Sequence, residues 1–378
     1  MRKDAFIAAY VRTPFTSARK GALAAARPDD LGAHIIRALL ERTKIDGTEV
    51  EDVVWGCAFP EGEQGLNIGR IVGMLAGLPE TTAGATVNRW CGSSVQAIQM
   101  AAGMILMNAG EAFIAGGSES MSRVPMMGFN LLPPPLWSGK DVENYTNMGL
   151  TAEEVARRYN ISRREQDSFA LASHAKALTA RNAGRLANEI APYRIGDACV
   201  SEDGCPRATT LEKLGDLKTV FLENGTVTAG SSSPMTDGAT AVLVCTEDFL
   251  HKHNLQPLAR IESFAVSGCA PEIMGMGPVE ASRKAMARAG ITIDDIDIVE
   301  MNEAFAAQSE ACRRELNIPE EKLNLDGGAL ALGHPLGATG GRLVGKAATL
   351  LQREKGRRAL ATQCIGGGMG IAMLLEAV

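Results

Sequence analysis

The spacing of apolar residues alternates between two periods along the first third of the chain. Continuous apolar runs predict buried strands, and they cover residues 5–11, 50–57, 84–87 and 111–117. Between these runs, apolar residues recur every three or four positions, which predicts helices at residues 31–42, 67–78 and 95–106. Strands that alternate with helices indicate an α/β fold.

The last third of the chain repeats this order. An acidic turn and an apolar run at residues 294–300 resemble residues 51–54, and residues 327–334 resemble the strand that leads to Cys91. A predicted helix at 341–351, a predicted strand at 358–364 and a final predicted strand that follows Gly370 and ends at Leu375 complete the repeat. Two similar halves suggest an internal duplication. Cys91 and His334 would then occupy equivalent junctions and could face one crevice.

The middle of the chain has a different composition. Residues 118–150 are rich in Met and Pro and predict a long loop, and residues 196–224 are polar and irregular. Thr151 and Ser162 each begin a Ser/Thr-x-x-Glu pattern, which predicts two capped helices, the second ending near Asn182. We therefore divide the chain into a first core half at 1–118, a loop domain that returns to the core at 119–250, and a second core half at 251–378.

Composition narrows the class of protein. The 378 residues are 46% hydrophobic and 22% charged, which is typical of a soluble globular protein. A net charge of −6 without a Lys/Arg block argues against nucleic acid as a partner. No apolar run reaches the length of a membrane span, and the start has no secretory signal. Eight cysteines without a CxxC pair indicate reduced thiols in the cytoplasm.

Metal ligands are scarce in this sequence. The histidine pair at 251–253 lies in a polar segment, which we interpret as a solvated turn. We expect neither a metal site nor a bound cofactor.

Reactive residues stand at the ends of predicted strands. Cys91 precedes a helix, whose free amides and dipole favour a thiolate, and His334 and Cys364 follow other apolar runs. Asn302 ends a fourth run. Glycine-rich turns at 327–333 and 366–370 offer backbone N–H groups to an oxyanion. Each residue alone could be structural, but strand ends are where α/β proteins place ligands.

Four motifs and their order resemble those of the thiolases. They are Val87-Asn88-Arg89-Trp90-Cys91-Gly92-Ser93-Ser94, Asn302-Glu303-Ala304-Phe305-Ala306, Gly333-His334-Pro335-Leu336-Gly337 and Cys364-Ile365-Gly366-Gly367-Gly368. The resemblance extends over nearly the whole chain. It implies a duplicated αβαβα layered core with an inserted loop domain.

The resemblance also implies catalytic roles. Cys91 would be the nucleophile that takes the acyl group from a 3-ketoacyl-CoA. His334 would activate Cys91 and, with a water held by Asn302, bind a thioester oxygen. Cys364 would act as the acid and base toward acetyl-CoA and CoA. The N–H groups of Cys91 and Gly366 would form a second oxyanion hole.

At the positions that would bind the substrate, the sequence matches the thiolases at some residues and departs from the short-chain members at others. Ser233, Met148, Ala304 and Phe305 match positions near the substrate, and Arg207 is a candidate for the CoA phosphates. Asn147 stands before Met-Gly where acetoacetyl-CoA thiolases usually have histidine. This departure favours a degradative 3-ketoacyl-CoA thiolase over a short-chain acetyl-CoA C-acetyltransferase. The family further implies a homodimer or homotetramer, and a hydratase/dehydrogenase subunit as a possible partner.

Three other classes compete with this interpretation. Residues 340–347 nearly spell a phosphate-binding loop, but Ala347 replaces the hydroxyl that would bind Mg²⁺. A thiolase-like scaffold subunit would have lost Cys91, His334 or Cys364, and all three are present. A ketoacyl synthase would have His or Asn at the position of Cys364.

Overall fold

The apolar runs of the sequence form the strands of a large twisted sheet in the computed structural model, which describes residues 3–135 and 147–378. The first half of the sheet contains β1 (Phe6–Arg12), β3 (Asp52–Gly56), β4 (Ala83–Val87), β5 (Ala112–Ser120) and β8 (Thr236–Cys245). The second half contains β9 (Ala259–Gly268), β10 (Ile298–Met301), β11 (Arg358–Ile365) and β12 (Met369–Glu376). Outside these halves, β2 (Thr16–Ser17) pairs with β8, and β6 (Tyr193–Ile195) pairs with β7 (Ala198–Val200).

The two halves repeat one strand order, which confirms the predicted duplication. The first half runs β1-β8-β5-β3-β4, and the second runs β9-β12-β11-β10 with the same parallel and antiparallel pairings. A single bridge between Val299 and Leu323 stands where the first half has β4. The halves join through a short antiparallel pairing of β1 with β9.

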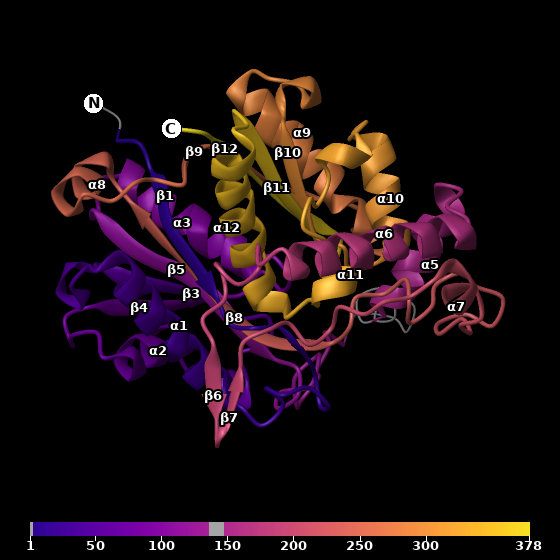
Figure 1. Cartoon of the computed structure of the whole chain (residues 1–378), viewed down its shortest axis with the longest axis horizontal. Coiled ribbons are helices and arrows are strands. Elements are labelled where there is room, and N and C mark those ends of the chain that lie inside the picture. Colours follow the sequence, from indigo (N-terminus) through magenta and orange to yellow (C-terminus); the bar gives the residue numbers. More distant parts are fainter. Residues whose placement is uncertain (1–2, 136–146) are drawn as a thin grey trace.

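Helices separate and cover the two halves of the sheet (Figure 1). The helices are α1 (Pro28–Thr43), α2 (Ile68–Ala76), α3 (Ser93–Leu106), α5 (Met148–Arg158), α6 (Arg163–Asn182), α7 (Leu211–Gly215), α8 (Glu247–His253), α9 (Gly277–Ala289), α10 (Ala306–Glu315), α11 (Ala329–Leu332) and α12 (Leu336–Glu354). α3 and α12 pack together between the halves, where Ile98, Leu343 and Val344 lie in the central core. α1 and α2 cover the first half, and α9 and α10 cover the second. The resulting order is the predicted αβαβα layering.

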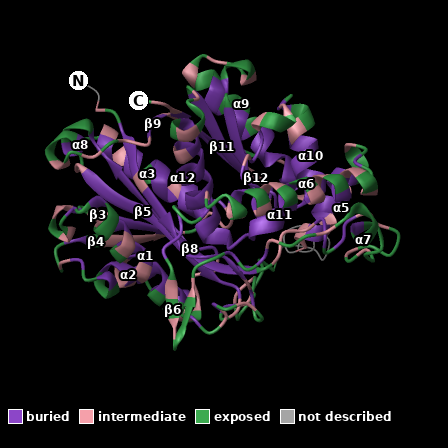
Figure 2. Ribbon diagram, in the orientation of Figure 1, coloured by how far each residue is buried: buried purple, intermediate pink, exposed green. Residues whose placement is uncertain are grey.

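Burial follows these layers. In Figure 2 the strands and the central helices are buried, whereas the exposed residues gather on the outer helices and on the β6–β7 hairpin. The catalytic motifs that the sequence suggested therefore begin or end elements of the buried interior.

The middle segment packs against the second half of the core. α5 and α6 both contact α10, and α6 also contacts α11 and α7 (Figure 1). The capping box predicted at Ser162 is confirmed, because Ser162 and Glu165 bond each other's backbone N–H groups at the start of α6. The box predicted at Thr151 is wrong, since α5 is capped by Asn147 and Thr151 lies inside the helix. The boundaries at 118 and 250 stay a prediction.

Four other details differ from the predictions. β4 is a strand but not a buried one, because it lies at the edge of the sheet with Ala83 exposed. Residues 327–334 form a turn and the short helix α11 rather than a strand, and α12 begins at Leu336 instead of 341. The polar segment after residue 246 is the helix α8.

Candidate active site

Cys91 lies in a tight turn between β4 and α3. The preceding Trp90 has a φ of 43°, in the left-handed region, and the Ser93 hydroxyl donates to the Trp90 carbonyl at 2.6 Å. Gly92 permits close packing against β11, because a Cβ there would lie 2.5 Å from Ile365 Cδ1. From the same strand, Gln363 Nε2 donates to the Cys91 carbonyl oxygen. The turn of the first half is therefore held by a strand of the second half.

His334 is held by hydrogen bonds on three sides. Its backbone N–H donates to Thr236 Oγ1 at 3.0 Å, and Nδ1 lies 2.6 Å from Thr339 Oγ1. Nε2 lies 3.2 Å from Asn302 Nδ2. Because an amide NH₂ only donates, Nε2 is the acceptor in this arrangement and Nδ1 carries the ring proton toward Thr339. The ring thus holds its unprotonated nitrogen, Nε2, beside the end of β10.

Cys364 is the third reactive residue, and it is buried on β11. It belongs to an apolar cluster whose other members include Ala304, Phe305 and the partly buried Met148. Burial raises the pKa of Cys364 well above its usual range, and the nearby Cys91 raises it further. The two thiols therefore lie close enough for their charges to interact.

Backbone N–H groups point at the Cys91 sulfur. The N–H groups of Gly366 and of Cys91 itself both bond it, and each lowers its pKa. These are the two donors that the sequence motifs suggested for an oxyanion hole. Neighbouring residues link this pair to the histidine side. Leu336 belongs to the apolar cluster against which Cys91 packs, and its N–H donates to the His334 carbonyl at 2.9 Å. The Asn302 N–H donates to the Thr362 carbonyl at 3.0 Å, two residues before Cys364 on β11. The structure thus brings Cys91, His334, Asn302, Cys364 and Gly366 into one region.

Burial opposes the thiolate that the position of Cys91 before a helix favours. Burial raises the pKa of Cys91 to about 11, and the charge of Glu119 adds to this effect against the Gly366 hydrogen bond. Burial also lowers the pKa of His334 to about 4, so that the imidazole is neutral at pH 7. The loss of water around the thiol raises its pKa by more than the hydrogen bonds from the Gly366 and Cys91 N–H groups lower it. Both shifts favour a thiol and a neutral imidazole over an ion pair.

The candidate substrate residues fall into two groups. Met148 lies against Gly366, where a Cβ would be 3.3 Å from its Sδ. The N–H of Ser233 donates to the Ala304 carbonyl at 3.0 Å, which places that segment along Ala304 and Phe305. These four residues therefore adjoin the Cys364 side of the site.

Arg207 lies apart from this group. It is exposed in the loop before α7, and its backbone N–H donates to His174 Nδ1 on α6 at 3.3 Å. Within residues 3–135 and 147–378 it makes no hydrogen bond or ion pair with the other candidate residues.

Two residues of the site were missed by the sequence analysis. Phe221 packs edge-to-face on Phe305, with ring centroids 6.1 Å apart, and covers Gly149. Glu119 is a buried carboxylate that accepts N–H bonds from Ala58 at 2.8 Å and from Gly337 at 3.0 Å. Glu119 lies beyond the apolar run at 111–117, in the segment predicted as a loop, whereas β5 extends to Ser120. Nothing around Phe221 distinguishes it from a core aromatic.

The described residues contain no group of three or more His, Cys, Asp or Glu side chains placed to hold a metal ion. In the same part of the chain, no helix combines the length and apolar character that crossing a membrane requires.

Comparison with known proteins identifies the family. The model of the thiolase N-terminal domain matches residues 5–248, and the model of the thiolase C-terminal domain matches residues 255–377. The chain belongs to the thiolase family. A thiolase of Bacillus subtilis (strain 168), described as 3-ketoacyl-CoA thiolase, is 44% identical over 99% of this chain and 99% of its own length.

Two further thiolases agree over the full length. Proteins of Alcanivorax borkumensis and Idiomarina loihiensis, both described as 3-ketoacyl-CoA thiolase, are each 45% identical to this chain. The match covers all of this chain in both cases, with 99% and 100% of the relatives covered respectively. The thiolase resemblance of the four motifs therefore extends across both core halves and the loop segment.

Proposed function

We propose that this thiolase cleaves 3-ketoacyl-CoA with CoA, and yields acetyl-CoA and an acyl-CoA shortened by two carbons. The observation that carries the proposal is that Cys91, from the first half of the core, receives the Gly366 N–H and interacts with Cys364 of the second half, which also supplies the His334–Asn302 pair. The descriptions of the full-length relatives agree with it. CoA enters as a substrate, and the proposal requires no bound cofactor.

The first half-reaction forms an acyl-enzyme. The Cys91 proton moves to His334 Nε2 as the sulfur attacks the 3-keto carbon, because a thiol with a pKa of about 11 must lose its proton during attack. The bond between C2 and C3 then breaks. Its electron pair stays on acetyl-CoA, which takes a proton from Cys364. The oxyanions formed on the way would be bound at the Cys91 and Gly366 amides and beside His334.

The second half-reaction restores the enzyme. CoA gives its thiol proton to the Cys364 thiolate, and its sulfur attacks the acyl group on Cys91. The Cys91 sulfur leaves and recovers its proton from His334. Because one product departs before CoA reacts, the kinetics are ping-pong.

A trapped acyl-enzyme tests this proposal. Brief incubation with a 3-ketoacyl-CoA, followed by proteolysis and mass spectrometry, should find the acyl group on the peptide that contains Cys91. Cys91→Ala should lower kcat by about 10⁴-fold or more, as expected when a nucleophile is removed. The Cys245→Ala variant, at a buried thiol of the core, is the control for loss of a cysteine as such. An acyl group on another residue, or none with no thiolysis, would reject the proposal.

The second candidate is a short-chain acetyl-CoA C-acetyltransferase. The apolar wall of Met148, Phe221 and Phe305 favours longer acyl chains over the acetyl group alone. A series of 3-ketoacyl-CoA substrates of increasing chain length separates the two activities. We expect kcat/KM to rise or hold beyond four carbons, and a strong preference for four carbons would favour the acetyltransferase.

We also propose that the thiolase works as a homodimer or homotetramer in the cytoplasm. The edge strand β4 leaves backbone groups available to a second copy, and the nearby Leu66, Met74 and Met107 are exposed. All eight cysteines are free, which fits a reducing compartment. Light scattering in solution gives the subunit number. A hydratase/dehydrogenase subunit as partner is a proposal from the family resemblance, and co-purification tests it.

A further inference from the structure

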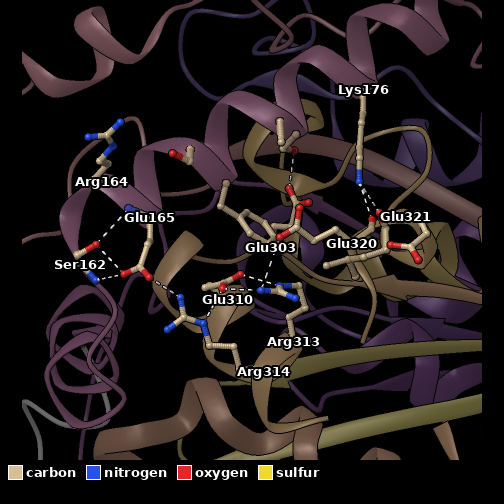
Figure 3. Close-up of a pocket in the computed structure, with 15 residues that line it drawn as sticks. Ser162, Arg164, Glu165, Lys176, Glu303, Glu310, Arg313, Arg314, Glu320 and Glu321 are labelled. Carbon is tan, nitrogen blue, oxygen red and sulfur yellow. Dashed lines mark hydrogen bonds and ion pairs between the residues drawn. The ribbon is translucent and has the colours of Figure 1, made fainter. Parts of the chain in front are cut away.

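Glu303 lies in the turn that follows β10, between the candidate active site and a cavity on the other side of this turn. The cavity has a volume of about 830 Å³ and lies between α6 and α10 (Figure 3). Glu303 directly follows Asn302 in sequence, lines this cavity and is only 2% exposed. Its carboxylate points toward α6, whereas Asn302 contacts His334.

The Glu303 carboxylate accepts three hydrogen bonds from three parts of the chain. Oε2 accepts from Ser173 Oγ of α6 at 2.6 Å and from the Leu330 N–H of α11 at 3.2 Å. Oε1 accepts from Asn324 Nδ2 at 2.7 Å. The fit is close, because a Cβ on Gly328 would lie 2.1 Å from Glu303 Cδ. Both oxygens of the carboxylate therefore accept hydrogen bonds within the protein.

These bonds hold both members of the Asn302–His334 pair. Asn302 is the neighbour of Glu303, and His334 follows two residues after the end of α11. α11 has only four residues, and so short a helix has little stability of its own. The bond from Leu330 to Glu303 thus fixes the segment that delivers His334. We propose that Glu303 is a positioning residue that sets the spacing of Asn302 Nδ2 and His334 Nε2.

The site requires a carboxylate rather than an amide. A Gln at 303 could accept from Ser173 and Leu330 with its oxygen, but its NH₂ would then face the NH₂ of Asn324. Asn324 cannot turn away, because it bonds both the N–H and the carbonyl of Met301 at 2.9 Å. Two donors would then oppose each other in a buried site, and the turn that carries Asn302 would shift.

The same cavity offers a matched control. Glu310 also lines it and is buried, but its carboxylate pairs with Arg313 at 2.8 Å and with Arg314 at 2.6 Å on its own helix (Figure 3). It has no hydrogen bond to Asn302, His334 or α11 among the residues that the structure describes. Glu310→Gln therefore removes a carboxylate from the same wall without touching the catalytic turn.

A double-mutant cycle tests this positioning role, which rests on the proposed function. We expect Glu303→Gln to lower kcat for 3-ketoacyl-CoA thiolysis about 10²-fold with little change in KM, since small displacements of catalytic groups have effects of that size. Glu310→Gln should keep the rate of the wild type. The loss in the Asn302→Ala/Glu303→Gln double variant should be smaller than the product of the two single losses, because part of the effect of Glu303 is exerted through Asn302.

Three results would overturn the assignment. They are a Glu303→Gln enzyme as fast as the wild type, an equal loss in Glu310→Gln, or effects of Asn302→Ala and Glu303→Gln that multiply. A wild-type enzyme that cleaves no 3-ketoacyl-CoA would instead reject the proposed function, and the assignment with it.

Chemical rescue gives an independent measurement. Glu303→Ala would extend the cavity to the vacated acceptor position, and added formate should raise its kcat by replacing the carboxylate. Asn302→Ala, which keeps Glu303, should gain nothing. An equal gain in both variants, or none in either, contradicts the assignment.

Discussion

The position of Cys91 depends on its two neighbours. Trp90 adopts a left-handed φ of 43°, a conformation that is disfavoured by on the order of 1–3 kcal/mol for a bulky residue. Gly92 has no space for a side chain because Ile365 lies against it. The strain is held by the Ser93 hydroxyl and by the contact with β11. The nucleophile is thereby presented at a fixed place between the two halves.

The pH dependence of Cys91 alkylation follows from its raised pKa. With a pKa of about 11, about one Cys91 side chain in ten thousand is a thiolate at pH 7. Because the thiolate is the reactive form, iodoacetamide labelling should rise about tenfold per pH unit up to that pKa. Mass spectrometry of the Cys91 peptide measures the rate, and the exposed Cys199 controls for the reagent. A rate that levels off near neutral pH would instead indicate a thiolate–imidazolium pair.

The start of α6 offers a matched pair of serines. Ser162 caps the helix, and its side chain accepts from the Glu165 N–H at 3.3 Å. Ser162→Ala should therefore lower the free energy of unfolding by about 1 kcal/mol. Ser168 is exposed inside the same helix, so Ser168→Ala should leave it unchanged or raise it slightly, because Ala has the higher helix propensity. Urea unfolding measures both, and equal losses would contradict the capping role.

The sequence predicts helices and strands correctly where the local pattern of residues determines them. Its predictions are wrong where contacts with distant parts of the chain determine the structure. Ser162 and Thr151 start the same four-residue pattern, but only Ser162 is a cap, because Asn147 starts α5 one turn earlier. A strand is predicted at residues 327–334, where the chain forms a turn and α11, because a short apolar run has no distinguishable period. The roles of Cys91, His334 and Cys364 came from motifs, whereas the part of Phe221 depends on packing that no local pattern records.

Buried charges connect the two halves of the whole molecule. Arg12 of β1 bonds Asp203 at 2.6 Å and Glu189 at 2.8 Å, and Lys346 of α12 bonds Glu189 at 3.0 Å and Asp326 at 2.7 Å. Burial would raise the pKa of Glu189, but Lys346 and Arg12 lower it to about 2. Such charges are tolerated only as a complete set, since each is removed from water. The network therefore makes the position of α12, and with it His334, depend on the loop segment.

Removing one buried cation from this network should destabilise the protein more than removing an exposed cation from its surface. Lys346→Met leaves Glu189 and Asp326 buried with fewer partners, and should lower the free energy of unfolding by about 3–5 kcal/mol at pH 7. Arg157→Met removes an exposed partner of Glu154 and should change little. Urea unfolding at one protein concentration compares the two. Protonation of Glu189 and Asp326 removes the cost of burying charges that lack a partner. The loss of unfolding free energy in Lys346→Met should therefore shrink as the pH falls. A similar loss in Lys346→Met and Arg157→Met would contradict the role of the network.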